Sequence, residues 1–216
     1  MTVDIRVYAV LDPARCRGRR LGELPEAAAR GGATLLQYRD KSASTRSLIE
    51  AASEIGRALA PFDVPLLIND RVDVTLAVGC AGVHVGAEDM PAADARRLLG
   101  PEAIVGYTVH AAEEADAVPD GILDYASVGG VFATASKHNP QAPIGLEGVR
   151  ALIGRLPDLP VCAISGIDHT NAAEAIAAGA DGIAVISDIF MADDVMAATQ
   201  RLRGIVDVAL GQRSPS

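Results

Sequence analysis

The feature that most constrains the fold of this chain is a regular alternation of two kinds of segment along its 216 residues. Short apolar runs rich in β-branched residues, typical of buried strands, alternate with longer stretches in which apolar residues recur at helical spacing. Eight such alternations follow one another, and no linker or low-complexity segment divides them. The pattern predicts parallel βαβ units with right-handed crossovers.

Three of the predicted helix-to-strand junctions share small residues around a Gly: "ARGGATLLQ", "AVGCAGVHV" and "AAGADGIAV". This pattern indicates a left-handed helix cap that leads directly into the next strand. Strands are predicted at Arg6–Leu11, Thr34–Tyr38, Pro65–Ile68, Gly82–Val85, Ile104–Thr108, Tyr125–Val128, Val161–Ile164 and Gly182–Ile186. Helices are predicted at Ser47–Ala60, Asp94–Leu99, Leu146–Leu156, Asn171–Ala178 and Asp194–Val208.

Eight units in one uninterrupted chain favour an α/β fold, a single-domain (β/α)8 TIM barrel, with a doubly wound open sheet as the alternative. Residues 1–211 are predicted to form the barrel domain and residues 212–216 a frayed carboxy-terminal tail. Half of the residues are hydrophobic but only 3% are aromatic. The core must therefore be built from Ala, Val, Ile and Leu, which suits strands that are buried on both faces.

The overall charge argues against several classes of partner. A net charge of -9 and an isoelectric point near 4.9 disfavour nucleic acid and anionic membrane surfaces. No apolar run approaches the roughly 18 residues of a membrane span. The first residues also lack the pattern of a signal peptide, so a cytoplasmic location is predicted. Small molecules are the expected partners, and assembly into a homo-oligomer is left open.

The cysteines and histidines show no metal-binding or disulfide pattern. The three cysteines are odd in number and far apart, which predicts buried or spectator thiols (Cys16, Cys80 and Cys162). The four histidines have no metal-ligand spacing (His84, His110, His138 and His169). Because His84 lies between two valines of a predicted strand, we expect a hydrogen-bonded histidine of the core or rim rather than a ligand.

In a barrel of this type the functional groups come from the loops at the carboxyl ends of the strands. Lys41 and Lys137 both fall in such loops, after the second and sixth strands, whereas the other 17 of 19 basic residues are Arg. A compact ammonium can act as a point charge against phosphate oxygens. The two lysines therefore indicate an anion-binding role for this face.

Two aspartates follow neighbouring strands on the same predicted face. Asp70 comes after the third strand and Asp89 after the fourth, so their carboxylates can converge on the barrel rim. Mg²⁺ typically takes one or two carboxylates together with waters and phosphate oxygens, and this pair beside lysines fits that pattern. The alternative is that each aspartate only caps the helix that follows it.

The loops after the last three strands suggest a phosphate site. "GGVFATASKHNP" places Thr134, Ser136 and Lys137 in four residues, either as a solvated turn or as an anion-binding loop. Backbone N–H groups at Ser165 and Gly166, and those at Ser187 at the start of a short predicted helix, could approach a phosphate closely. A plain turn at Gly166 is the alternative.

Several spaced motifs occur in one order: "QYRDK", "LINDRVDVTLAVGCAGVHVGAEDMP", "VGGVFATASK", "AISGI" and "AAGADGIAVIS". In these motifs the chain resembles the thiamine-phosphate synthase family over nearly its whole length. The resemblance implies a TIM barrel that uses Mg²⁺ to join a hydroxymethylpyrimidine diphosphate to a thiazole phosphate, releasing pyrophosphate. A dissociative path through a pyrimidine cation is then expected, and it needs no protein general base because the attacking ring nitrogen has no proton to lose.

The same resemblance implies roles for individual residues. The predicted catalytic residues, which stabilise the departing pyrophosphate, are Arg39, Lys41 and Lys137. Asp70 and Asp89 are the predicted Mg²⁺ ligands. The pyrimidine diphosphate is expected to contact Gln37, Arg39, Lys41, Asn69, Thr108 and Lys137, with Thr108 on the diphosphate. The thiazole phosphate is expected to contact Thr134, Ser136, Gly166, Ile186 and Ser187.

Two positions depart from the family pattern. Ala87 replaces a common Gln, and Ser165 replaces the first Gly of a usual Gly-Gly pair, where a side chain could narrow the phosphate site.

Two other functions remain as alternatives. A thiazole tautomerase on the same barrel would not need the paired carboxylates, and its His near the end of the sixth strand is replaced here by "GGV". A non-catalytic sensor of phosphate ligands would bind without turnover.

Overall fold

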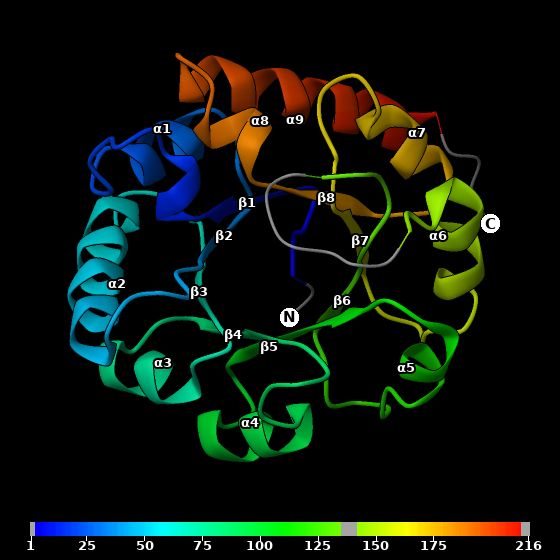
Figure 1. Cartoon of the computed structure of the whole chain (residues 1–216), viewed down its shortest axis with the longest axis horizontal. Coiled ribbons are helices and arrows are strands. Elements are labelled where there is room, and N and C mark those ends of the chain that lie inside the picture. The colour runs from blue at the N-terminus through cyan, green and yellow to red at the C-terminus, as the bar shows by residue number, and fades with distance from the viewer. Residues whose placement is uncertain (1–2, 135–141, 213–216) are drawn as a thin grey trace.

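The computed structural model describes residues 3–134 and 142–212, in which the strands form a closed parallel barrel in the order β1-β2-β3-β4-β5-β6-β7-β8. The strands are β1 Val7–Leu11, β2 Leu35–Tyr38, β3 Leu66–Asn69, β4 Gly82–Val85, β5 Ile104–Val109, β6 Tyr125–Val128, β7 Val161–Ile164 and β8 Gly182–Val185. Pairing of β1 with β8, with Val7 opposite Ile183, closes the ring (Figure 1). The predicted (β/α)8 barrel is confirmed, and the open sheet is wrong.

Helices surround the ring of strands (Figure 1). They are the 3-10 turn η1 Pro13–Arg15, α1 Leu24–Arg30, α2 Thr45–Leu59, α3 Val72–Val78, α4 Ala92–Leu99, α5 Ala112–Asp116, α6 Gly145–Ile153, α7 Ala172–Ala177, α8 Ser187–Phe190 and α9 Val195–Gly211. All five helices predicted with bounds are present, shifted by up to three residues at their ends. Three more, α1, α3 and α5, were not predicted, because five to seven residues are too few to show a helical period.

The glycine junctions have the conformation that their sequence pattern predicts. Gly32, Gly79 and Gly179 all have positive φ, at 97°, 72° and 114°. Gly79 is the left-handed cap of α3, and the strand β4 begins three residues later. A residue with a Cβ would be strained at this φ, so glycine permits the short connection between helix and strand.

The core has two layers. The larger cluster lies between the outer face of the strands and the helices, and it contains mostly Ala, Val, Ile and Leu, as expected. A smaller cluster fills the inside of the barrel, where Tyr8 and Tyr125 are its largest fully buried side chains. Ile5 belongs to this inner cluster and Val3 packs against it, so the segment before β1 closes the amino-terminal end of the barrel.

Gly106 of β5 makes room for the ring of Tyr125 inside the barrel. A Cβ at Gly106 would overlap the ring and hydroxyl of Tyr125. We therefore expect Gly106→Ala to destabilise the protein by about 1–3 kcal/mol, the usual cost of overpacking a core. Gly204→Ala is the matched control, because Gly204 lies within α9 with nothing within 4 Å, and alanine there should be neutral or stabilising by up to about 1 kcal/mol. Urea denaturation of both variants measures the difference, and equal stabilities would contradict this account.

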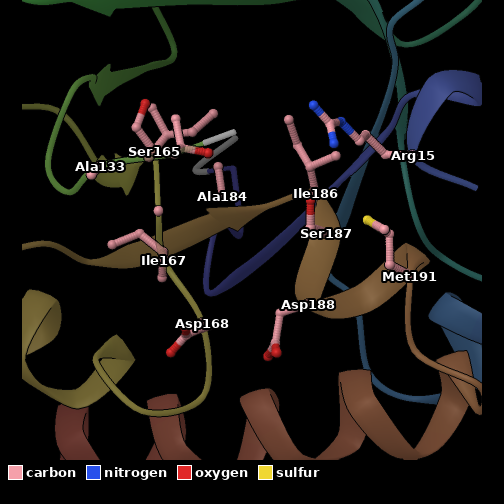
Figure 2. A pocket seen from close by; sticks show the side chains of 13 residues that line it. Arg15, Ala133, Ser165, Ile167, Asp168, Ala184, Ile186, Ser187, Asp188 and Met191 are labelled. Carbon is pink, nitrogen blue, oxygen red and sulfur yellow. The ribbon is translucent and has the colours of Figure 1, made fainter. Parts of the chain in front are cut away.

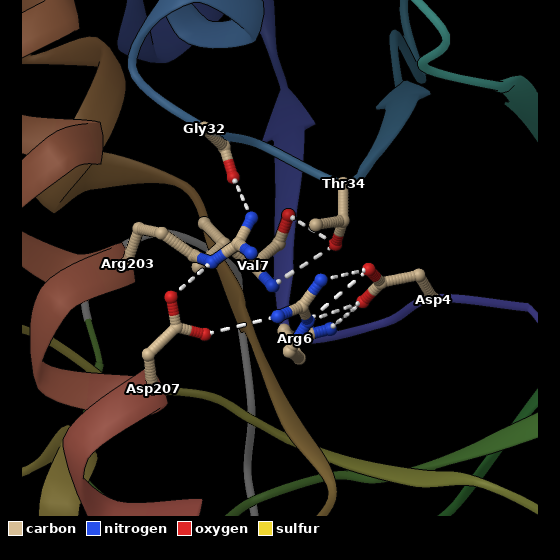
Figure 3. Close-up of polar contacts among 7 residues, drawn as sticks. All are labelled: Asp4, Arg6, Val7, Gly32, Thr34, Arg203 and Asp207. Carbon is tan, nitrogen blue, oxygen red and sulfur yellow. Dashed lines mark hydrogen bonds and ion pairs between the residues drawn. The ribbon is translucent and has the colours of Figure 1, made fainter.

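Polar contacts at the amino-terminal end of the strands fasten the barrel to its last helix (Figure 3). Arg6 binds Asp4 at 2.6 Å and Asp207 of α9 at 3.1 Å. Arg203 of α9 contacts Asp207 at 2.7 Å and donates to the Gly32 carbonyl at 3.1 Å. These contacts lie at the end of the barrel opposite the loops that follow the strands.

The remaining expectations concern thiols, membrane spans and the tail. All three cysteines are free thiols; Cys16 and Cys162 are buried and Cys80 is partly buried. No helix within the described residues has both the length and the apolar composition to cross a bilayer. The last helix ends at Gly211, and residues 213–216 lie outside the described part, so the frayed tail stays a prediction.

Candidate active site

The loops after β2, β3 and β4 bring three of the predicted residues together. Lys41 Nζ lies 2.7 Å from Asp70 Oδ2, and the Asp70 and Asp89 carboxyl groups interact directly. Asp89 Oδ2 also accepts a hydrogen bond from the Gly86 N–H at 2.8 Å, which closes the turn after β4. The convergence expected from neighbouring parallel strands is therefore present.

The electrostatics of this carboxylate pair favour a cation. Burial raises the pKa of Asp89, and the hydrogen bond and negative charge of Asp70 raise that pKa further, while Lys41 opposes the shift. Two carboxylates that interact unfavourably with each other offer the hard oxygen ligands that Mg²⁺ prefers. The described residues contain no cluster of three or more His, Cys, Asp or Glu suited to a metal, so any ion here would rely on this pair and on substrate oxygens.

Neither aspartate caps a helix, so that alternative is wrong. The N-cap of α3 is Arg71 and that of α4 is Pro91. Asp70 has a φ of 62°, in the left-handed region that is unfavourable for a residue with a Cβ. Strain of this kind costs on the order of 1–3 kcal/mol and persists where the surrounding structure enforces it, often at functional sites.

Arg39 is held by an aspartate that the sequence did not indicate. Its Nη1 lies 2.5 Å from Asp12 Oδ2, and the two side chains are only 18% and 8% exposed. Asp12 follows β1 directly and also accepts from the Ala14 N–H at 3.0 Å, as the N-cap of η1. The available signal was its position directly after Leu11, the last residue of β1.

Gln37 and Thr108 are joined by a chain of hydrogen bonds inside the barrel. Gln37 donates to the Tyr8 hydroxyl, and Tyr125 donates to the same hydroxyl at 2.8 Å. His84 lies with Nδ1 2.7 Å from the Tyr125 hydroxyl and Nε2 2.6 Å from Thr108 Oγ1. His84 is thus the satisfied core histidine that its sequence pattern predicts.

Asn69, the remaining residue predicted to contact the pyrimidine substrate, is the last residue of β3 and is paired in register with His84 of β4. It is partly exposed and directly precedes Asp70. Asn69 therefore lies at the carboxyl end of its strand, beside His84 of the hydrogen-bonded chain on one strand and next to Asp70 of the carboxylate pair in sequence.

A cavity of about 520 Å³ lies among the loops after β6, β7 and β8 (Figure 2). Four of the five residues predicted for the thiazole phosphate line it: Thr134, Gly166, Ile186 and Ser187. The short helix α8 begins at Ser187, as predicted. The fifth residue, Ser136, and the predicted catalytic residue Lys137 lie outside the described residues.

Arg15 forms a further wall of this cavity, and sequence reasoning missed it. Figure 2 shows its side chain beside Ile186. The loop that carries Arg15 is fixed to the loop after α8, because Arg17 Nη1 binds Asp193 Oδ1 at 2.5 Å and Arg19 donates to the Ala192 carbonyl at 3.0 Å. A cationic side chain is thereby placed in the wall of the cavity, which Asp168 and Asp188 also line.

Ser165, one of the two departures from the family pattern, lines the cavity but is hydrogen-bonded to the neighbouring loop. Its Oγ accepts from the Gly130 N–H at 3.1 Å, and Ser165 itself is 6% exposed with a φ of 90°. Gly166 beside it has a φ of 66°, and a Cβ there would lie 2.6 Å from the Ala133 carbonyl oxygen. The serine thus ties the end of β7 to the loop that leads to Thr134.

We expect Ser165→Ala to lower the free energy of unfolding by about 1–3 kcal/mol, because the buried Gly130 N–H loses its acceptor while the strained φ remains. Ser165→Gly should cost less, since glycine adopts this φ without strain. Chemical denaturation of the two variants measures both values. An alanine variant as stable as the wild type would show that the hydrogen bond contributes nothing.

Comparisons with known proteins agree with this geometry. The family described as "Thiamine monophosphate synthase" matches residues 7–189. A thiamine-phosphate synthase of Agrobacterium fabrum is 51% identical over 217 residues, covering 99% of both chains, and one of Chloroflexus aurantiacus is 51% identical, covering 95% of this chain and 94% of the other. A solved thiamine phosphate pyrophosphorylase from Pyrococcus furiosus is 38% identical with a TM-score of 0.85, covering 97% of this chain and 98% of the other.

The match extends over nearly all of the chain, and the predicted site residues that the structure describes lie on one rim of the same barrel. The chain therefore belongs to the thiamine monophosphate synthase family, whose members are transferases of thiamine biosynthesis.

Proposed function

We propose that this transferase couples 4-amino-2-methyl-5-hydroxymethylpyrimidine diphosphate to 4-methyl-5-(2-phosphoethyl)thiazole, giving thiamine phosphate and pyrophosphate. The proposal is supported by two groups of polar side chains in the loops that follow the strands of one barrel. The Lys41–Asp70–Asp89 group suits a metal-bound diphosphate, and the cavity lined by Arg15 and Ser187 suits a phosphate. The loop after β1 joins the two sites.

That loop contributes to both sites within four residues. Asp12 holds Arg39 on the diphosphate side, and Arg15 lines the phosphate cavity. A bimolecular coupling needs both reactants held next to each other in one orientation, and this arrangement supports such positioning. A tautomerase or a sensor of one phosphate ligand would have no use for the carboxylate pair and the Arg39 site.

The donor set fits Mg²⁺, which would be held by the Asp70 and Asp89 carboxylates and would neutralise charge on the diphosphate oxygens. Lys41 now pairs with Asp70, so a bound ion would free its ammonium to contact the diphosphate. Arg39 is already held in place by Asp12 and can donate to the departing pyrophosphate.

In the proposed reaction the bond between the pyrimidine CH₂ and the diphosphate oxygen breaks, and its electron pair leaves with pyrophosphate. The thiazole nitrogen then forms the new C–N bond to the CH₂ group. That nitrogen carries no proton, so no residue has to act as a base. The buried His84, engaged at both ring nitrogens, agrees with a site that does no proton transfer.

Incubation of the protein with both substrates and Mg²⁺ tests the proposal. Thiamine phosphate should be detected by mass spectrometry together with an equal amount of pyrophosphate, and EDTA should stop both. Absence of product with both substrates present would contradict the proposal and favour a sensor, and conversion of the thiazole phosphate without pyrophosphate would favour a tautomerase.

We also propose a cytoplasmic location, where the three cysteines would stay reduced.

A further inference from the structure

The loops after β2 and β3 contact each other at two points. One is the ion pair of Lys41 with Asp70, at 2.7 Å. The other is a hydrogen bond in which Arg71 Nη2 donates to Thr45 Oγ1 at 2.9 Å. Arg71 directly follows Asp70, and Thr45 is the first residue of α2. The second contact therefore joins the same two loops without using a predicted metal ligand.

The guanidinium of Arg71 is oriented by its own side of the contact. Its Nε and Nη2 donate to the two carboxylate oxygens of Asp73, at 2.8 and 2.6 Å, and such a paired contact fixes the plane of the guanidinium. The backbone of Arg71 is also held. Its N–H donates to the Asn69 carbonyl at 2.8 Å, and its carbonyl accepts from the Thr75 N–H at 3.1 Å, at the start of α3. The reach of Arg71 towards α2 is thus set by the loop after β3.

The loop after β2 is tied to the beginning of α2. Asp40 Oδ1 accepts from the N–H groups of Ser42 and Ala43, at 2.9 and 3.0 Å. Ser44, the N-cap of α2, accepts from an N–H of the first helical turn at 3.2 Å. The side chain of Lys41 in this loop is 59% exposed, so packing does little to place its ammonium. The place of the ammonium depends instead on where the loop lies.

We propose that Arg71 is a positioning residue for Lys41, an inference that rests on the proposed function. When Asp70 takes a metal ion, Lys41 has to leave it to contact the diphosphate, and one of the two contacts between the loops is lost. The hydrogen bond from Arg71 to Thr45 can remain, and it keeps the loop of Lys41 beside the carboxylate pair. Holding the ammonium near the diphosphate beforehand lowers the ordering cost of binding.

Thr45→Val tests the contact without changing any charge. Valine has nearly the size of threonine but no acceptor for Arg71. We expect the dissociation constant of pyrophosphate, measured by calorimetry with Mg²⁺, to rise about three- to ten-fold, the effect of one hydrogen bond. KM for the pyrimidine diphosphate should rise by the same factor, and KM for the thiazole phosphate should stay within about two-fold. Thr45→Ser keeps the hydroxyl and should restore the affinity to within about two-fold.

A double-mutant cycle tests whether the contact acts through Lys41. Lys41→Met alone should weaken pyrophosphate binding, and adding Thr45→Val to it should cause no further loss. Arg71→Met removes both the contact and a positive charge. Arg46→Met is the matched control for the charge, because Arg46 is an exposed arginine next to Thr45. Pyrophosphate should bind about three- to ten-fold more weakly to Arg71→Met than to Arg46→Met.

Four results would overturn the inference. They are a further loss when Thr45→Val is added to Lys41→Met, equal losses in the valine and serine variants of Thr45, equal losses in Arg71→Met and Arg46→Met, and a wild type that does not bind pyrophosphate with Mg²⁺. A wild type that binds pyrophosphate but forms no thiamine phosphate would refute only the proposed function. The calorimetric comparison would still test Arg71, so the two failures are distinguishable.

Discussion

Asp89→Asn is expected to lower kcat/KM for thiamine phosphate formation on the order of 10²–10³-fold, the usual loss when one preorganised electrostatic contact to the transition state is removed. The substitution keeps the shape of the side chain and its acceptor for the Gly86 N–H, so the turn after β4 should be retained. It removes one of the two carboxylates available to Mg²⁺. Steady-state kinetics at saturating Mg²⁺ measure the loss, and near-normal turnover would contradict the assigned role.

The same variant should be slightly more stable than the wild type without metal. The raised pKa of Asp89 means that the folded protein holds this proton more tightly than the unfolded chain does. Its contribution therefore favours folding at low pH and is lost as the pH rises from the ordinary value of 3.8 through the raised pKa. Asparagine carries no charge and so avoids the cost of ionising Asp89 in the folded protein. We expect the free energy of unfolding to rise by up to about 1 kcal/mol at pH 7, as for other partly exposed charge pairs.

Thermal unfolding with Mg²⁺ and pyrophosphate provides the control. The wild type should be stabilised by these ligands in proportion to their affinity, whereas Asp89→Asn should show little shift. A metal-free Asp89→Asn protein that unfolds more easily than the wild type would show that the carboxylate pair is structural rather than a metal site.

Arg39→Ala is expected to reduce activity by a similar 10²–10³-fold and, in addition, to destabilise the fold. Asp12 is 8% exposed and would lose its partner, and an uncompensated buried charge of this kind costs about 3–5 kcal/mol. Because Asp12 still accepts from the Ala14 N–H, the cost should fall at the lower end of that range. Kinetics and urea denaturation measure the two effects separately.

The double variant Asp12→Asn/Arg39→Ala separates stability from activity. Removing both charges should recover most of the stability that Arg39→Ala loses, because no buried charge is left unpaired. It should not recover activity, since the donor to the pyrophosphate remains absent. Recovery of activity together with stability would show that Arg39 acts only through the fold.

The barrel could be predicted because its signals are local. Gly82–Val85, Tyr125–Val128 and Val161–Ile164 have the bounds that their apolar runs indicate. The glycine junctions at Gly32, Gly79 and Gly179 reflect one backbone conformation that a single residue type permits. The short helices were missed because five to seven residues present too little of a helical period.

The site was predictable where the topology alone determines proximity. Asp70 and Asp89 follow adjacent strands, so their convergence, and their contact with Lys41 from the loop after β2, follow from the strand order. The contacts of Arg39 and Ser165 could not be predicted in this way. Each depends on which side chain of another loop is within hydrogen-bonding distance, and neither Asp12 nor Gly130 carries a pattern in the sequence.

By itself, the sequence determined the barrel and the family, because strand period, glycine caps and spaced motifs are properties of neighbouring residues. Only the tertiary structure decided the partners of the buried groups. Tyr8, His84 and Tyr125 come from β1, β4 and β6, and their hydroxyl and ring atoms meet only because the closed sheet directs them into one interior. The alternation of side chains along a strand predicts which residues point into the barrel. It cannot tell which of these side chains meet across the interior.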